Sequence, residues 1–129
     1  MSDEPTVLVV DDNRPLADGF AKILEDEYEV LTAYGGEEAL NLLDDSIDAV
    51  LLDRRLPDIP GDDVLREIRT GDYDCRVAVV SAADPNSDLD CEAYLTKPVW
   101  GSDVLRDTVT DLLDEDGRST DGGNRTQTV

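Results

Sequence analysis

A run of four apolar residues, Ala49 to Leu52, lies between Asp48 and Asp53 and leads into a loop with two prolines. A strand with one face in water would alternate apolar and polar residues. This run has no polar position, so it predicts a strand buried on both faces, as in parallel sheets that have helices on both sides. The run therefore favours an α/β fold. It also places Asp53 at the carboxyl end of a central strand, the edge at which such sheets bind ligands.

Strand-like and helix-like segments alternate along the rest of the chain. Short β-branched or apolar runs predict strands at residues 6–10, 28–33, 49–52, 76–80 and 94–96. Apolar residues at helical spacing predict helices at residues 14–26, at about 37–45, between Gly61 and Gly71, and at 102–114. This alternation predicts βαβ units, a parallel sheet and right-handed crossovers that cover both of its faces.

The length of 129 residues is that of one domain. We expect the folded domain at residues 5–114, and a disordered polar tail at residues 115–129, which are rich in Gly, Ser, Thr and Asn and lack periodicity. No apolar run approaches the roughly 20 residues of a membrane span. The acidic start MSDEPT does not fit a signal peptide. We therefore expect a cytoplasmic protein without a membrane partner.

The net charge of -21 restricts the partners of the chain, because 32 acids face only 11 bases. Phosphate backbones and acidic lipids attract Lys and Arg, so direct binding of nucleic acid or membranes is not expected. Asp (23) outnumbers Glu (9) and Arg (9) outnumbers Lys (2), a skew that resembles proteins of halophilic archaea. An ordinary acidic protein is the alternative. Two cysteines and no histidine do not suffice for a zinc site.

Five polar side chains follow predicted strands and should meet at one edge of the sheet. They are Asp11 and Asp12 after the first strand, Asp53 after the third, Ser81 after the fourth and Lys97 after the fifth. Crowded carboxylates either share protons or bind a hard cation such as Mg²⁺, which prefers oxygen ligands. Together with the metal, Lys97 would neutralise an incoming phosphoryl group. The chemistry that fits is phosphoryl transfer onto the Asp53 carboxylate.

These residues resemble a known family. The acidic pair, the segment LLDRRLPDIPG around Asp53, Ser81, and Tyr94 three residues before Lys97-Pro98 resemble the receiver domain of two-component response regulators, over about residues 5–114. The phrase LDRRLPDIPG also looks like haloarchaeal receivers that carry a small helical output domain. The resemblance implies a flavodoxin-like, five-stranded parallel sheet in the order 2-1-3-4-5. It also implies that a sensor histidine kinase phosphorylates Asp53.

The resemblance further implies a role for each site residue. Mg²⁺ would be bound by Asp12, Asp53 and the Arg55 backbone carbonyl, with assistance from Asp11. Ser81 would hydrogen-bond the phosphoryl group, Tyr94 would turn inward as the aromatic switch, and the Lys97-Pro98 bond would be cis. The chain would then be a signalling domain rather than a metabolic enzyme. It would act on an unknown downstream protein, as a monomer or as a phosphorylation-dependent dimer.

Alternatives remain at the sequence level. In the structural alternative, Asp53 merely begins the loop, since Asp is common where a chain turns, Ser81 merely ends a strand, and Tyr94 is a core aromatic that finds a partner for its hydroxyl. A pseudo-receiver that serves only as an interaction module is one functional alternative. A phosphohydrolase is another, but it needs a second carboxylate shortly after the nucleophile, where Arg54 and Arg55 stand.

The connection between the last two strands is short for a receiver, since only residues 82–92 join them. An extended chain spans about 3.3 Å per residue but a helix only about 1.5 Å, so a long helix could not reach back. We expect the fourth helix of the family to be absent or at most about two turns long. The sheet would be thinly covered there. The chain would then signal through another face, such as that of its first and last helices, or bind a partner in the gap.

Overall fold

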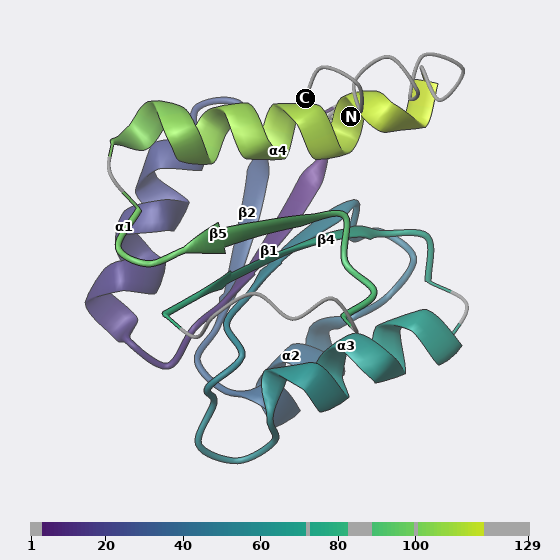
Figure 1. Ribbon diagram of the computed structural model, residues 1–129. Coiled ribbons are helices and arrows are strands. Elements are labelled where there is room, and N and C mark those ends of the chain that lie inside the picture. Colours follow the sequence, from purple (N-terminus) through teal and green to yellow (C-terminus); the bar gives the residue numbers. More distant parts are fainter. Residues whose placement is uncertain (1–3, 72, 83–88, 100, 118–129) are drawn as a thin grey trace.

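The computed structural model describes residues 4–71, 73–82, 89–99 and 101–117. Five parallel strands form one sheet in the order β2-β1-β3-β4-β5, with helices on both faces (Figure 1). The strands are β1 (Thr6–Val10), β2 (Glu29–Ala33), β3 (Ala49–Leu52), β4 (Arg76–Ser81) and β5 (Ala93–Thr96). Within the described ranges, the helices are α1 (Arg14–Leu24), α2 (Gly36–Leu42), α3 (Gly61–Thr70) and α4 (Ser102–Gly117). This strand order confirms the predicted flavodoxin-like fold.

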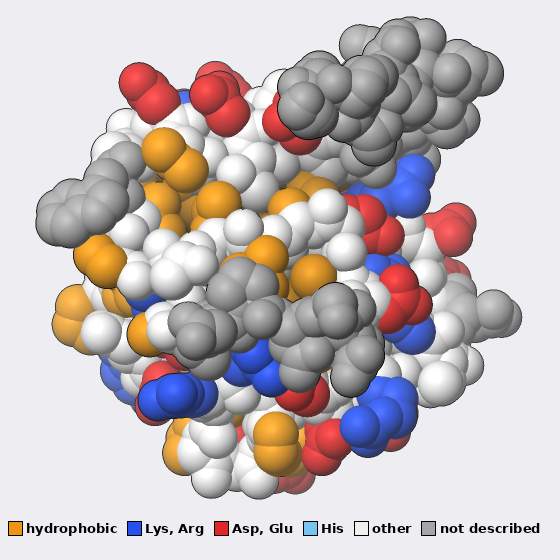
Figure 2. Space-filling model, in the orientation of Figure 1, with side chains coloured by type: hydrophobic (Ala, Val, Ile, Leu, Met, Phe, Trp, Pro, Cys, Tyr) orange, Lys and Arg blue, Asp and Glu red, His pale blue; other side chains and the backbone are white. Residues whose placement is uncertain are grey.

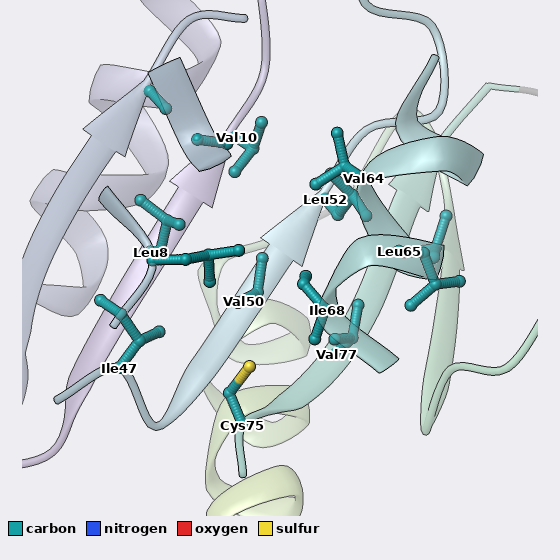
Figure 3. Close-up of a cluster of buried hydrophobic side chains, with 14 residues drawn as sticks. Leu8, Val10, Ile47, Val50, Leu52, Val64, Leu65, Ile68, Cys75 and Val77 are labelled. Atoms are coloured by element: carbon teal, nitrogen blue, oxygen red, sulfur yellow. The ribbon is translucent and has the colours of Figure 1, made fainter. Parts of the chain in front are cut away.

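The sheet separates two apolar clusters, and the central strand β3 contributes to both. Val50 and Leu52 pack on the face covered by α2 and α3, where Val64 and Ile68 of α3 meet them (Figure 3). Residues 49 and 51 point to the opposite face and pack with side chains of α1 and α4. All four β3 residues are buried. Because burial of a Val or Leu side chain contributes about 1.5–3 kcal/mol, this two-sided packing fixes β3 in the centre.

Two helices end earlier than the apolar pattern predicts. Helix α1 ends at Leu24 rather than residue 26, because the amides of Glu27 and Tyr28 both donate to the Leu24 carbonyl and turn the chain. Helix α2 ends at Leu42 rather than residue 45. There the Asp44 carboxylate accepts from the backbone amide of residue 46, and a turn forms that leads into β3. In both cases local turn hydrogen bonds override the apolar periodicity.

The connection from β4 to β5 contains no long helix. Ala82 and the segment 89–92 are not helical, so three helical turns do not fit between the strands, as predicted; residues 83–88 lie outside the described residues. Arg69, near the end of α3, holds the described part of the connection. Its guanidinium donates to the carbonyl of Asp90 at 2.8 Å and to the carboxylate of Glu92 at 2.7 Å. These two hydrogen bonds hold the segment just before β5 against α3.

Helix α4 continues to Gly117, three residues beyond the predicted end at 114. Glu115 is a good helix former and Gly is common where helices end, which accounts for the extension. The rest of the predicted polar tail, residues 118–129, lies outside the described residues. In the described part of the chain, no helix has the length and apolar character that a membrane span requires.

The surface carries the excess of acids. Figure 2 shows acidic side chains over α4, at the top of the view. Asp103, Asp107 and Asp111 are exposed and stand four residues apart, so they form one stripe along the helix. Like charges at this spacing repel, which weakens the helix at low salt.

Candidate functional site

The carboxyl ends of four strands meet at one edge because of their register. Val10 pairs with Leu52 in the sheet, so the next residues, Asp11 and Asp53, stand side by side. The Asp53 amide donates to the Val10 carbonyl at 3.0 Å and continues this pairing by one residue. On the other side, the Lys97 amide donates to the Ser81 carbonyl at 2.9 Å. The predicted convergence therefore follows from parallel pairing.

Lys97 joins the two buried carboxylates. Its Nζ lies 2.7 Å from Asp11 Oδ2 and 3.1 Å from Asp53 Oδ2. Asp11 is 2% exposed and Asp53 is 5% exposed, so both charges depend on a partner within the protein. Burial lowers the pKa of the Lys97 ammonium, but the hydrogen bonds and charges of the two aspartates outweigh burial and raise it. Lys97 therefore stays charged at neutral pH.

Backbone amides hold the second oxygen of each carboxylate. Asp11 Oδ1 accepts from the Asn13 amide at 3.0 Å, and Asp53 Oδ1 accepts from the Arg55 amide at 3.2 Å. Burial raises the pKa of Asp11, and the negative charge of Asp53 adds to the increase, while Lys97 and the Asn13 amide oppose it. Both carboxylates are thus fixed in orientation and face the same ammonium.

The three aspartates could hold a metal ion together. One carboxylate oxygen from each of Asp11, Asp12 and Asp53 lies within 4.8 Å of the others. Asp12 is exposed, whereas the other two are buried, so the site is open to water on one side. Mg²⁺ binds carboxylate oxygens and usually keeps several waters. The donor set and its partial exposure fit such an ion.

Ser81 and Tyr94 occupy different depths. Ser81 is fully buried at the end of β4, directly before the edge. Tyr94 is half-buried on β5 and packs against the cluster on the α2 and α3 face. The Lys97-Pro98 bond is cis, as predicted.

Arg55 contributes its backbone at the site, while its side chain is exposed. The resemblance assigns a metal contact to its carbonyl, and the Arg55 amide donates a hydrogen bond to Asp53 Oδ1 at 3.2 Å. Binding of a metal by this carbonyl stays a prediction.

Asp58 supports the site, although its place in the sequence predicts no role for it. Its carboxylate accepts from the amides of Gly36 at 2.8 Å, Glu37 at 3.0 Å and Ile59 at 2.8 Å. These hydrogen bonds lower its pKa to about 2. Asp58 thus caps α2 from the loop that follows Asp53. The signal in the sequence was the pair Gly35-Gly36: a glycine N-cap has no side chain, so the cap must come from elsewhere.

Comparisons with known proteins agree with this geometry. A family model described as the response regulator receiver domain matches residues 7–110. A Haloferax volcanii protein described as "Putative transcriptional regulator" is 52% identical over 118 residues, which are 88% of this chain and 20% of that protein. The chain therefore spans about a fifth of the length of this relative.

Solved structures share the fold. A CheY-like response regulator receiver domain protein from Methanospirillum hungatei has a TM-score of 0.83 and 25% identity, over 91% of this chain and 99% of that one. The response regulator TrrA from Thermotoga maritima, in complex with Mg²⁺-BeF, has a TM-score of 0.75 and 33% identity, over 84% of this chain and 99% of that one.

The match extends from β1 into α4 and includes the whole edge at which the polar side chains meet. The fold, the strand order and the cluster formed by the three aspartates and Lys97 agree with this family match. The chain belongs to the family of response regulator receiver domains.

Proposed function

We propose that Asp53 accepts a phosphoryl group from a sensor histidine kinase and that this modification changes the interactions of the domain. The observation that carries the proposal is the position of Lys97, whose ammonium lies between the Asp11 and Asp53 carboxylates. In the transfer, the bond from phosphorus to the kinase histidine nitrogen breaks and a bond to an Asp53 oxygen forms. The ammonium therefore lies next to the position that the negatively charged phosphoryl group would occupy.

Mg²⁺ would be held by Asp12, Asp53 and the Arg55 carbonyl, with assistance from Asp11. The spacing of the three carboxylates supports this assignment, and so does the Mg²⁺-BeF complex of the similar protein TrrA. When bound, the ion supplies positive charge for the phosphoryl oxygens. Ser81 would donate its hydroxyl to one of these oxygens, and Tyr94 would respond as the switch residue.

The expected partners of the domain follow from its net charge and from the family to which it belongs. Receiver domains take part in two-component signalling, so the upstream partner would be a sensor histidine kinase and the downstream partner a protein. With a net charge of -21, the domain itself would not bind nucleic acid. It would act in the cytoplasm, as a monomer or as a phosphorylation-dependent dimer, and its only chemistry would be its own phosphorylation and dephosphorylation.

Labelling with acetyl phosphate and Mg²⁺ tests the proposal. Intact-mass spectrometry should show one added phosphoryl group on the wild-type chain and none on Asp53→Ala. The control variant Asp63→Ala, which removes an exposed acid of α3, should be labelled like the wild type. Chelation of Mg²⁺ should prevent labelling. If the folded wild-type protein accepts a phosphoryl group neither from acetyl phosphate nor from histidine kinases, it is instead a pseudo-receiver.

A further inference from the structure

Arg69, in the last turn of α3, joins the starts of two strands. Its Nη1 donates to the carbonyl of Cys75, directly before β4, at 3.3 Å. Its Nε donates to the carbonyl of Asp90 at 2.8 Å, and its Nη2 donates to Glu92 Oε1, directly before β5, at 2.7 Å. The Arg69 side chain is 21% exposed and that of Glu92 is 23% exposed. Partial burial and three bonds from one rigid guanidinium distinguish this contact from an ordinary surface ion pair.

The Glu92 carboxylate also completes the hydrogen bonding of β4. The Val77 amide donates to Glu92 Oε1 at 2.7 Å, and the Glu92 amide donates to the Val77 carbonyl at 2.9 Å. The paired positions of β4 and β5 begin one residue later, at Ala78 and Ala93. Val77 is fully buried, so its amide needs an acceptor within the protein. The Glu92 side chain supplies this acceptor at the point where regular strand pairing starts.

Strand β5 depends on such a contact more than the inner strands do. It is the last strand of the sheet and lies beside β4. None of its four residues is buried, whereas all four residues of β3 are. The described residues of the connection before it, 82 and 89–92, add no helix over this edge. Because a buried face is what specifies register in a sheet, apolar packing specifies the register of β5 only weakly.

The register of β5 matters because Lys97 directly follows this strand. The Lys97 amide donates to the Ser81 carbonyl at 2.9 Å, and its Nζ lies 3.1 Å from Asp53 Oδ2. A slip of one residue would move Lys97 by about 3.3 Å and turn its side chain to the other face of the sheet. The ammonium would then lose its contact with Asp53. Only the four residues of β5 separate Glu92 from Lys97, so a restraint at Glu92 acts directly on this lysine.

We propose that Arg69 and Glu92 are positioning residues for Lys97: together they hold β5 in register on β4, so that the Lys97 ammonium reaches Asp53. This inference deepens the proposed function and rests on it for its role in phosphorylation. The position of Lys97 itself does not depend on phosphorylation, so it can be measured separately.

The test follows the Lys97 side chain by NMR on protein labelled with ¹³C at lysine Cε, without Mg²⁺ and in molar KCl. The chain has two lysines, and Lys22 in the last turn of α1 is the internal reference. The two protons on Cε differ in chemical shift when the side chain is held and coincide when it rotates freely. This splitting should be present for Lys97 in the wild type and should collapse in Glu92→Ala and in Arg69→Gln.

Amide hydrogen exchange reports the register of β5. In both variants the Lys97 amide should exchange about tenfold faster, as expected when a hydrogen bond to a charged group is lost. The amides of β1 and β3 should keep their wild-type rates, which separates a local effect on β5 from a general loss of stability.

Two further variants serve as controls. Glu92→Gln keeps an oxygen that can accept from the Val77 amide and from Arg69, so it should preserve the Lys97 splitting that Glu92→Ala loses. Arg66→Gln removes another arginine of α3, which forms an exposed pair with Asp63. In this variant the splitting and the exchange rates should equal those of the wild type.

The proposal is overturned if the Lys97 splitting and the exchange of the Lys97 amide keep their wild-type values in folded Glu92→Ala and Arg69→Gln. If Glu92→Ala does not fold, Arg69→Gln alone decides, because it leaves the Glu92 acceptor in place for the Val77 amide.

Acetyl phosphate labelling of the same proteins with Mg²⁺ separates this result from the proposed function. If both proposals hold, Arg69→Gln should be labelled several-fold more slowly than Arg66→Gln. Released Lys97 in the variants, together with a wild type that takes no label, would support the positioning role and reject the phosphorylation. Held Lys97 in the variants, together with a wild type that is labelled, would do the reverse.

Discussion

Gly61 lies so close to the backbone of Asp53 that no side chain fits between them. A Cβ at residue 61 would stand 2.0 Å from the Asp53 carbonyl oxygen and 2.7 Å from the Arg54 Cα. Because the two backbone segments lie so close, the Gly61 amide can donate a hydrogen bond to the Arg54 carbonyl. The first residue of α3 thereby closes the loop that begins at Asp53, and the loop has one defined path.

Gly61→Ala should therefore distort the loop. The methyl group cannot enter without backbone movement, so we expect a loss of about 1–3 kcal/mol in the free energy of unfolding, as for overpacked sites. Labelling by acetyl phosphate should also slow down. Denaturant unfolding in molar KCl measures the first effect. Gly19→Ala in α1 is the control, because nothing lies within 4 Å of its Cβ position; it should be neutral or stabilising. Equal stabilities of the two variants would contradict the argument.

Asp58 should make stability depend on pH in the acid range. The pKa is lowered from 3.8 to about 2 in the fold, so the stabilisation is complete above the unfolded value and is lost as the pH falls toward 2. Asp58→Asn should lower the melting temperature at pH 7, and the difference from the wild type should shrink between pH 4 and pH 2. Asp26→Asn removes an exposed acid after α1 and should show no such convergence. A difference that is constant with pH would argue against the cap.

Arg55 should prolong the life of the phosphorylated state. Its side chain is exposed two residues beyond Asp53, and the sequence offers no acceptor group there or at Ala83 to orient a hydrolytic water. The guanidinium could instead pair with phosphoryl oxygens. We expect slow autodephosphorylation and a several-fold faster loss of label in Arg55→Asn. Decay of the label after removal of acetyl phosphate gives the rate, with Arg66→Asn as an exposed arginine control. Unchanged or slower decay in Arg55→Asn would refute the role.

The acidic surface should make stability depend on salt. Repulsion among the excess acids is screened as the Debye length falls to about 3 Å at 1 M, so the melting temperature should climb from dilute buffer to molar KCl. Asp107→Asn removes the middle charge of the exposed stripe on α4. It should raise the melting temperature at low salt and leave it nearly unchanged at high salt. A flat salt profile of the wild type would show that the composition is not a halophilic adaptation.

Local sequence patterns predicted the sheet and the edge that carries the site. The uniformly apolar run Ala49 to Leu52 predicted a central strand, and acids or a lysine directly after strands predicted which side chains meet. These features are local in sequence, and parallel pairing converts them into contacts without further information. Asp11, Asp53 and Lys97 are found together for this reason. The absence of a long helix between β4 and β5 was likewise predicted from the small number of residues that join these strands.

The contacts that join distant elements depend on how the folded chain packs and could not be predicted from local patterns. Asp58 caps α2, which begins 22 residues before it, and Arg69 donates to the carbonyl of Asp90, which lies 21 residues after it. Arg54 and Asp62 pair at 2.9 Å because the hydrogen bond from the Gly61 amide to the Arg54 carbonyl closes the loop between β3 and α3. The direction of a long polar side chain depends on backbone angles and neighbours that no periodicity encodes. The sequence therefore predicted where the charges gather, while packing decided which of them hold the loops in place.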